Sequence, residues 1–459
     1  KANVAKNIAI LINVEAIESS PITIDRDGDG NLEIYYGDYG GIIHGLNYLG
    51  EAISGFPIQL EGANNDIWAS PSADDLDLDG NQELVINSKN GHLYVIDLYG
   101  NIELDLDLEQ YLMGSPALGD IDGDDINEII ISSYESSGRV YAINYDGTFV
   151  DGFPATLNEK VRRGAALYDF DNNGQEDIVV ATESDNIILI RDDGSFEVLF
   201  TADNKFKSAP TIAVIEGQPI IFAGSDDDHM YGLNSDGSIV INFDSGSNIR
   251  TSASFMNTYQ GVKIFFGSSN GMFYGIDSNG NSLSGWPISL DDNITTSPII
   301  CDIDGDGASE IFVGTSNLFY GFEEDGSALP FFPIDTDVGI SGSSFAADID
   351  NDGDQEIFFG ANTNLYGIDI KAPSSSVNDW GMYRGNHLRN GLFTAGGGNS
   401  NLGDINGDAI VDILDIVILV NLILGQNPDP GQMELADVNN DGVLSILDIV
   451  IIINIALDI

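Results

Sequence analysis

The sequence contains little cysteine, little histidine and no long apolar run. Its only cysteine, Cys301, stands in a short apolar segment, so no disulfide can form within the chain and the thiol is expected to be a small buried side chain. The four histidines leave few choices for a catalytic base. No apolar run approaches the ~20 residues of a membrane-spanning helix, so we expect no membrane span.

Basic residues are also scarce. The 459 residues include 16 Lys and Arg against 74 Asp and Glu, which gives a formal charge of −58. The 16 basic residues are scattered along the sequence. Because nucleic acids and anionic lipids are bound through basic patches, we expect neither as a partner. Metal binding would explain part of this excess of acidic residues. Adaptation to high salt is an alternative explanation for the remaining acidic residues.

Many acidic residues fall in short loops with one repeated spacing. In the first loop, residues 25–33, carboxylates stand at positions 1, 3, 5 and 9 and glycine at position 6, before an apolar strand. Alternate residues of a tight loop point inward, and Ca²⁺ takes about six to eight oxygen ligands. Gly30 can adopt the positive φ that turns the next carbonyl inward as well. The candidate ligands are Asp25, Asp27, Asp29, Asn31 and Glu33.

The same spacing recurs five more times, with Asp125 in the glycine place of the third copy. The further candidate ligands are Asp75, Asp77, Asp79, Asn81 and Glu83; Asp120, Asp122, Asp124, Ile126 and Glu128; Asp169, Asp171, Asn173, Gln175 and Asp177; Asp302, Asp304, Asp306, Ala308 and Glu310; and Asp348, Asp350, Asp352, Asp354 and Glu356. One such cluster is compatible with a solvated turn, since Asp and Gly favour turns. Six copies in one register instead predict about six Ca²⁺ ions.

The loops mark a long repeat. They begin at intervals of 45 to 50 residues, except for one interval of 133 that covers three periods. An apolar-aromatic strand such as Leu93–Asp97 occurs eight times, including in the two repeats without an acidic loop. In these two repeats residues 213–217 and 256–260 take the place of the acidic loop, and no metal is expected there. Four strands per unit at this period are typical of a β-propeller blade. We predict that residues 1–393 form a mainly β fold, an eight-bladed propeller. A seven-bladed propeller is the alternative. The strand-like segment Ile8–Val14 would close the ring on the last blade.

These features resemble a known family. The Asp-x-Asp-x-Asp-Gly-x-x-Glu loops between blade strands are similar to the FG-GAP/VCBS repeats of integrin-α-like and bacterial surface propellers, over roughly residues 20–370. The resemblance implies calcium in the first hairpin of each blade. Residues 379–384 and 389–391 resemble a Trp…Arg-x-Gly element that flanks such propellers.

The pattern changes after a Gly-rich linker at 394–402. Two loops with EF-hand spacing each lead into an apolar helix, predicted at 413–424 and 446–457. Their candidate ligands are Asp404, Asn406, Asp408, Ile410, Asp412 and Asp415, and Asp437, Asn439, Asp441, Val443, Ser445 and Asp448. Residues 403–459 closely resemble a type I dockerin, a small α-helical module with an EF-hand-like pair. The resemblance implies two more Ca²⁺ ions and a cohesin-type partner.

The resemblance to dockerins also indicates which residues would contact the partner. Dockerins usually carry small hydroxyl residues at two of the loop positions involved, whereas the residues here are mostly apolar. They are Ile413, Leu414, Val420, Asn421, Ile446, Leu447, Ile453 and Asn454. A helix that is apolar all round must be covered on more than one side. We therefore expect the module to dock on a cohesin-like domain or on a neighbouring copy of the chain, which would build a filament if head-to-tail. Docking on its own propeller is the alternative.

The predicted function is that of an extracellular, non-catalytic structural or adhesive protein. Calcium loops need a calcium-rich exterior, and the chain reads as a mature secreted or cell-surface form from which a signal peptide is already removed. One alternative is a polysaccharide lyase, which needs a base and a charge-neutralising group. However, His44 reads as structural and Asp226–His229 as a turn. The other is glycan binding on exposed Trp68 or Trp286, as a module of a cellulosome-like complex; for Trp286, packing between blades is the favoured role.

Overall fold

A computed structural model describes residues 6–12, 15–258, 260–290, 292–305, 308–371 and 379–394, and from the C-terminal part 405, 413–424, 435–436, 438, 444–445, 448–449 and 451–452. The chain divides into two compact units, residues 1–395 and residues 396–459.

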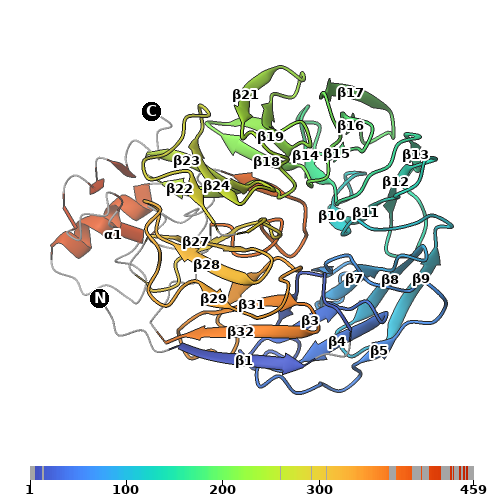
Figure 1. Ribbon diagram of the computed structural model, residues 1–459, viewed down its shortest axis with the longest axis horizontal. Coiled ribbons are helices and arrows are strands. Elements are labelled where there is room, and N and C mark those ends of the chain that lie inside the picture. Colours follow the sequence, from blue (N-terminus) through green and yellow to red (C-terminus); the bar gives the residue numbers. More distant parts are fainter. Residues whose placement is uncertain are drawn as a thin grey trace. The chain divides into compact units, whose positions relative to one another are not determined.

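The first unit is an eight-bladed β-propeller, in which eight antiparallel sheets stand in a ring (Figure 1). In the first four blades the strands, from the axis outward, are β2 (Ile22–Ile24), β3 (Glu33–Gly37), β4 (Ile42–Leu46) and β5 (Ile58–Gln59); β6 (Ser72–Asp74), β7 (Glu83–Asn87), β8 (His92–Asp97) and β9 (Ile102–Asp107); β10 (Ala117–Gly119), β11 (Glu128–Ser132), β12 (Arg139–Ile143) and β13 (Ala155–Thr156); and β14 (Ala166–Tyr168), β15 (Asp177–Ala181), β16 (Asn186–Ile190) and β17 (Phe196–Thr201).

The other four blades follow the same order. Their strands are β18 (Thr211–Ile215), β19 (Gln218–Gly224), β20 (His229–Leu233) and β21 (Ile239–Asp244); β22 (Ser254–Thr258), β23 (Gly261–Gly267), β24 (Met272–Asp277) and β25 (Ile288–Ser289); β26 (Ile299–Cys301), β27 (Glu310–Gly314), β28 (Leu318–Phe322) and β29 (Ile334–Asp335); and β30 (Phe345–Ala347), β31 (Glu356–Ala361), β32 (Asn364–Ile370) and β1 (Lys6–Ile12). Eight sheets confirm the eight-bladed prediction and exclude the seven-bladed alternative.

The ring is closed by pairing the N-terminal strand with the eighth blade. β1 is the outer strand of the eighth blade and pairs antiparallel with β32, with Lys6 opposite Ile370 and Ile12 opposite Asn364. Closure by the N-terminal strand is thus confirmed, although the strand begins and ends two residues earlier than predicted. Because strands from opposite ends of the sequence share one sheet, the blades cannot separate without breaking this pairing.

The core lies between neighbouring blades. The second strand of a blade is covered on both faces, as in β27, whose five residues are all buried. Phe319 of β28 stacks on Phe359 of the next blade, with ring centroids 4.2 Å apart. A strand buried on both faces reads as a continuous apolar run, which is why these segments lack the alternation of a half-exposed strand. Cys301 is fully buried, as predicted.

The chain that follows the eighth blade fills the centre of the ring. Residues 379–394 pass from one innermost strand to the next and accept hydrogen bonds from them. The donors are the backbone N–H groups of Ile300, Ala346, Ala73, Leu118, Leu167 and Ile212, bonded to the carbonyls of Trp380, Gly381, His387, Leu388, Asn390 and Gly391 respectively. The segment ends as β33 (Leu392–Thr394), parallel to β18. This central segment therefore joins blades that are distant in sequence.

Two fully buried arginines extend these bonds. Arg389 donates to the carbonyls of Ser20, Pro21, Pro71 and Tyr383. Arg384 donates to the carbonyls of Ala165, Pro210 and Arg389. Burial lowers the pKa of Arg384 to about 10 and that of Arg389 to about 9, because a guanidinium loses hydration there. The Trp…Arg-x-Gly element predicted to flank the propeller lies at its axis.

The second unit contains one described α-helix, α1 (Ile413–Ile423). Leu419 and Leu422 of α1 are buried in a small core with Ile405, Ala436 and Ile452. The predicted linker residues 395–402 and most of the predicted second helix lie outside the described residues. Among the helices of the described chain, none has the length and hydropathy of a membrane span.

Candidate metal centres

The six acidic loops occupy one position in the fold. Each joins the first and second strands of a blade, as the loop from β2 to β3 does, and they belong to blades one to four, seven and eight. Because every blade runs in the same direction, all six loops lie at one end of the propeller. In blade five, β18 and β19 meet at a short turn at Glu216 and Gly217, and in blade six β22 ends at Thr258.

The carboxylate at position 9 is buried and makes the same hydrogen bond in all six loops. It accepts from the backbone N–H of position 2. The bonds are Arg26 to Glu33 (3.1 Å), Leu76 to Glu83 (2.9 Å), Ile121 to Glu128 (2.7 Å), Phe170 to Asp177 (3.2 Å), Ile303 to Glu310 (2.9 Å) and Ile349 to Glu356 (3.0 Å). One carboxylate oxygen is thereby fixed to the loop, and the other oxygen can bind an ion.

The aspartate at position 1 holds the opposite side of the loop. Asp25 accepts from the N–H of Gly30 at 3.0 Å, and the same bond recurs from position 6 to Asp75, Asp120, Asp169 and Asp348. Position 6 has positive φ in each of these five loops, including 66° at Asp125. Aspartate tolerates this conformation better than most residues, which explains the substitution for glycine in the third loop.

The loops bring their acidic groups together. One oxygen from each of Asp302, Asp304 and Glu310 lies within 4.8 Å of the other two. The same holds for Asp25, Asp27 and Asp29; for Asp75, Asp77 and Glu83; for Asp120, Asp122 and Glu128; and for Asp348, Asp350 and Glu356. These oxygen sets fit a hard divalent cation such as Ca²⁺. Asp306 lies outside the described residues.

Burial raises the pKa of the position-9 carboxylates, and neighbouring aspartates raise it further. The pKa is about 9 for Glu310, about 8 for Glu356, about 7 for Glu83 and Glu128, and about 6 for Asp177. A buried carboxylate next to like charges is costly unless a proton or a cation neutralises it. The loops are therefore arranged to gain stability from a divalent cation.

Sequence reasoning missed a second strained position. Position 4 also has positive φ in all six loops, at Gly28, Leu78, Gly123, Asn172, Gly305 and Asn351. Glycine or asparagine fills it in five copies, and this was the available signal. Residues of positive φ in a nine-residue loop produce a tight turn. This turn brings positions 1 and 3 close to the position-9 carboxylate in four loops, and close to position 5, Asp29, in the first loop.

Most predicted ligands of the second unit lie outside the described residues. These are Asp404, Asn406, Asp408, Ile410, Asp412, Asp437, Asn439, Asp441 and Val443. Asp415 and Asp448 are fully buried, and the Ser445 N–H donates to Asp448 at 2.8 Å. Of the partner-binding residues, Val420 and Asn421 are exposed on α1. The side chains of Ile413 and Leu414, and residues Ile446, Leu447, Ile453 and Asn454, are not described.

Several other predicted residues have structural roles. His44 bonds to Asp38 at 2.8 Å and stacks on Tyr36, and residues 226–228 form the turn between β19 and β20. The predicted alternative that Trp286 is an exposed glycan-binding residue is wrong. Its ring is buried against Phe322 of the next blade, and its indole N–H donates to the Glu324 carbonyl at 3.0 Å.

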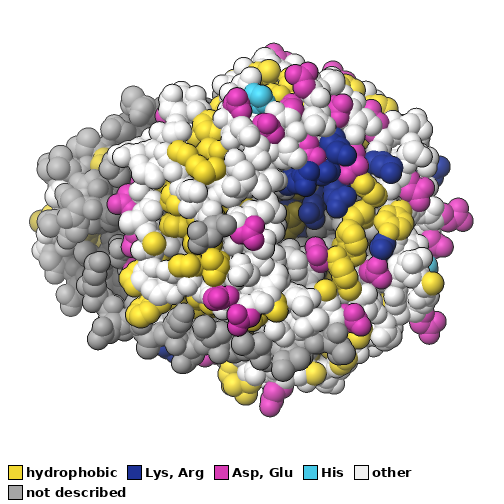
Figure 2. Space-filling model, viewed as in Figure 1, with side chains coloured by type: hydrophobic (Ala, Val, Ile, Leu, Met, Phe, Trp, Pro, Cys, Tyr) yellow, Lys and Arg dark blue, Asp and Glu magenta, His cyan; other side chains and the backbone are white. Residues whose placement is uncertain are grey.

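Seven of the 16 basic residues lie at one end of the propeller. Lys89 lies in the β7–β8 hairpin, and six others lie in the connections between blades, at the end of the propeller opposite the acidic loops. The six are Lys160, Arg162, Arg163, Lys205, Lys207 and Arg250. Figure 2 shows Lys and Arg side chains gathered beside a hollow near the axis. The prediction of scattered cations is corrected for these seven, because the stacking of neighbouring blades places their connections side by side.

Comparisons with known families match both parts of the chain. Residues 402–456 match the dockerin type I domain, and residues 120–180, which include the third and fourth acidic loops, match the FG-GAP-like repeat. The chain thus combines an FG-GAP-type propeller with a type I dockerin domain, as its sequence motifs indicate. The comparison with curated proteins gave no match.

Solved structures share the propeller fold. The chain is similar to Sqt1 from Saccharomyces cerevisiae, with 12% identity, a TM-score of 0.59 and coverage of 79% of this chain and 98% of that one. It is similar to the computationally designed Ika8 protein, at 13% identity and TM-score 0.53, over 78% and 97% of the two chains. BamB from Moraxella catarrhalis gives 15% identity and TM-score 0.51, over 79% and 98%.

Proposed function

We propose that this eight-bladed FG-GAP-type propeller with its type I dockerin domain is a calcium-loaded, non-catalytic component of an extracellular assembly. The dockerin match at residues 402–456 carries the proposal, because a type I dockerin domain implies a cohesin partner. The propeller is the part that is displayed, and the second unit is the part that attaches.

The calcium loops support a structural role for the metal. Their carboxylates bond to the loop's own backbone, as Glu83 does to Leu76 and Asp75 does to Gly80. An ion held this way neutralises a buried cluster and fixes the turn between two strands. Such sites need the calcium concentration found outside cells, which favours a secreted or cell-surface location.

The surroundings of the histidines support a non-catalytic propeller. His44 bonds to Asp38, His92 to Asp105 and His229 to the Asp227 carbonyl. His387 is largely covered at the axis, and its pKa is lowered to about 4 by burial and by the neighbouring Arg389. Proton abstraction near neutral pH is efficient with a base whose pKa lies near the working pH. The low pKa of His387 does not suit this role, and the rings of His44, His92 and His229 are already engaged in the bonds named above.

The test is capture of the full-length chain on immobilised type I cohesin domains, measured with calcium and with a chelator. Binding to at least one cohesin in calcium, and its loss in chelator, is expected. Exchanging both Asp415 and Asp448 for Asn should abolish capture, because each is a predicted calcium ligand of the dockerin unit. Asp304→Asn in the propeller is the matched control and should bind normally. Equal capture by the double variant would contradict the proposal.

Catalysis is tested separately by incubating the chain with acidic polysaccharides and following the ultraviolet absorbance of unsaturated products. No product is expected. Product formation that a single acidic or histidine substitution abolishes would establish the lyase alternative.

A further inference from the structure

The acidic loop at 169–177 has a basic neighbour. Arg191 follows β16, and its Nη1 lies 2.9 Å from Oδ2 of Asp177, the buried carboxylate at position 9 of the loop. The strand register explains this contact. Ile178 pairs with Ile190, so the residue that follows β16 lies opposite Asp177. A permanent positive charge is thereby fixed beside this loop.

The loops at 75–83 and 120–128 have no such neighbour. In blade two Asp97 lies opposite the position-9 carboxylate, and in blade three the residue at this place is Asn144. Among the described residues, no Lys or Arg side chain lies within ion-pair distance of an acidic group of either loop. These two loops therefore keep their full negative charge.

A lysine contacts the loop at 348–356. Lys371 follows β32, and its ammonium lies 2.7 Å from Oδ2 of Asp352, at position 5, and 3.4 Å from Oδ1 of Asp354. Asp369 is a third partner, at 3.1 Å. Because Asp352 is a predicted calcium ligand, the ammonium and a calcium ion would compete for the same carboxylate.

Blade six has a basic residue at the position-9 place itself. Met256 pairs with Lys263 in this blade as Cys301 pairs with Glu310 in blade seven. Lys263 is buried and forms an ion pair with Glu324. The blade architecture thus accepts a basic side chain where the calcium loops have a carboxylate, and this blade has no acidic loop.

The loops also differ in their own charge. The predicted ligands at 75–83 include four carboxylates, whereas those at 169–177 include three, because Asn173 stands at position 5. The carboxylate of Glu176, at position 8, lies against Gly119 of the neighbouring blade. The number of charged ligands is one of the properties that tune calcium affinity. A fixed cation acts in the same direction as a missing carboxylate, since like charges repel.

We propose that basic side chains grade the calcium affinities of the propeller loops. Arg191 weakens the loop at 169–177 and Lys371 weakens the loop at 348–356, so these two loops fill at higher calcium than those at 75–83 and 120–128. The inference rests on the calcium loading proposed above and adds which sites fill last. In limiting calcium the propeller is therefore loaded in blades two and three before blades four and eight.

The experiment follows hydrogen exchange of the full-length chain by mass spectrometry at a series of buffered free calcium concentrations. Peptides that cover each loop give the calcium concentration at which half of the protection is reached. This midpoint should lie higher for the loops at 169–177 and 348–356 than for those at 75–83 and 120–128. The order of the midpoints in the parent chain is the first result.

An exchange of residues between blades three and four is the matched test. Arg191→Asn introduces the residue type of blade three and should lower the midpoint of the loop at 169–177 roughly tenfold. Asn144→Arg is the reverse change and should raise the midpoint of the loop at 120–128 by a similar factor. A structural effect without a local charge effect would not shift the two midpoints in opposite directions.

Two further variants complete the set. Lys371→Gln should lower the midpoint of the loop at 348–356 about threefold, a smaller effect because both partners of this pair are partly exposed. Lys160→Gln changes the net charge of the chain by the same amount, at the opposite end of the propeller, and should leave every midpoint as in the parent chain. Melting curves of all variants in saturating calcium identify any that are misfolded.

The inference and the proposed function fail in different ways. Calcium-dependent protection with equal midpoints in the four loops, or an Arg191→Asn variant with the midpoint of the parent chain, overturns the inference alone. A Lys160→Gln variant that shifts the midpoints as Arg191→Asn does also overturns it, because net charge would then be the cause. Absence of calcium-dependent protection in all loops overturns the calcium loading as well.

Discussion

The guanidinium of Arg389 donates a hydrogen bond of 2.9 Å to the carbonyl of Pro21, 368 residues earlier in the chain. The same side chain also reaches Ser20, Pro71 and Tyr383. One residue near the end of the propeller sequence thus satisfies buried carbonyls in the first two blades. The central segment holds the ring together from inside, while the pairing of β1 with β32 closes it from outside.

Arg389→Met should therefore destabilise the propeller strongly. The substitution keeps much of the side-chain volume and leaves several buried carbonyls without a donor, at a cost of about 3 kcal/mol or more in the free energy of unfolding. Chemical denaturation of the full chain measures this. Arg163→Ala, an exposed arginine without an ion pair among the described residues, is the control and should change stability by less than about 0.5 kcal/mol. Equal effects of the two substitutions would mean that the central bonds contribute little.

Removing calcium should lower the melting temperature. Each site stabilises the folded state by about 2.7 kcal/mol when free calcium is 100 times the dissociation constant, and without the ion the clustered carboxylates repel. Calorimetry with and without chelator checks this. The control is the measured metal content of two variants. Asp304→Ala should lose one propeller ion, and Glu216→Asn, in a blade without an acidic loop, should lose none. An unchanged melting curve after exhaustive chelation would falsify the structural role of calcium.

His387 should make the propeller less stable in mild acid. Burial and Arg389 lower its pKa to about 4 in the folded state, whereas an unfolded histidine titrates near 6.5. Between these values the unfolded chain binds more protons, so the stability from the neutral imidazole is full above about pH 6.5 and is lost as pH falls toward 4. The difference in denaturation midpoint between the parent chain and His387→Gln should therefore shrink from pH 7 to pH 5. A constant difference would show that this imidazole does not titrate on unfolding.

The strands and loops of the propeller could be predicted because the relevant chemistry is local. The spacing of Asp302, Asp304 and Glu310 determines both the turn and the buried strand that follows it, and repetition excludes a chance cluster. The eightfold strand motif gave the number of blades for the same reason. Even the substitution at Asp125 was readable from the register of the other copies.

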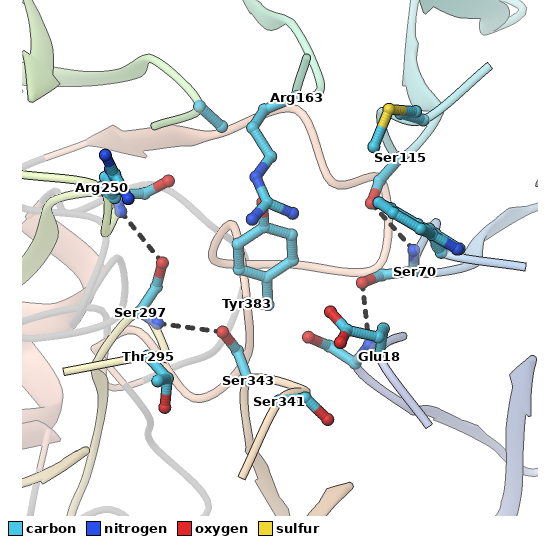
Figure 3. A pocket seen from close by; sticks show the side chains of 15 residues that line it. Glu18, Ser70, Ser115, Arg163, Arg250, Thr295, Ser297, Ser341, Ser343 and Tyr383 are labelled. Carbon is cyan, nitrogen blue, oxygen red and sulfur yellow. Dashed lines mark hydrogen bonds between the residues drawn. The ribbon is translucent and has the colours of Figure 1, made fainter. Parts of the chain in front are cut away.

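The grouping of these basic residues could not be predicted, since it depends on contacts within and between blades. Arg163 and Arg250 belong to connections of different blades and line one hollow (Figure 3) only when neighbouring blades stack. Asp226 looked like part of a polar turn, and its role as the shared partner of Lys207 and Arg250 depends on the folding of blade five with its two connections. The contacts of Arg384 and Arg389 with the carbonyls of four blades are equally nonlocal. The spacing of residues within one segment does not indicate which residues of other segments they will contact.

The last prediction concerns the exposed face of α1. Leu419 and Leu422 are buried in the small core of the second unit, whereas Val417 and Leu424 are 52% and 79% exposed and Val420 is also exposed. Apolar side chains grouped on one helix face are typical of an interaction site. We expect this face to contact a cohesin-type domain or a second copy of the chain. Val420→Glu should therefore weaken cohesin capture, and any self-association seen by light scattering, by roughly tenfold, because a charge would be buried without a partner.

The matched control is Val198→Glu. This valine is similarly exposed, at 49%, on the outer strand β17 of the propeller, so its substitution adds the same charge outside the second unit. Capture and scattering should stay at the level of the parent chain. If both variants behave alike, the exposed face of α1 is not the contact surface. If the parent chain is monomeric at high concentration and binds no cohesin, the second unit does not assemble in trans, and docking on its own propeller becomes the explanation for its apolar helix.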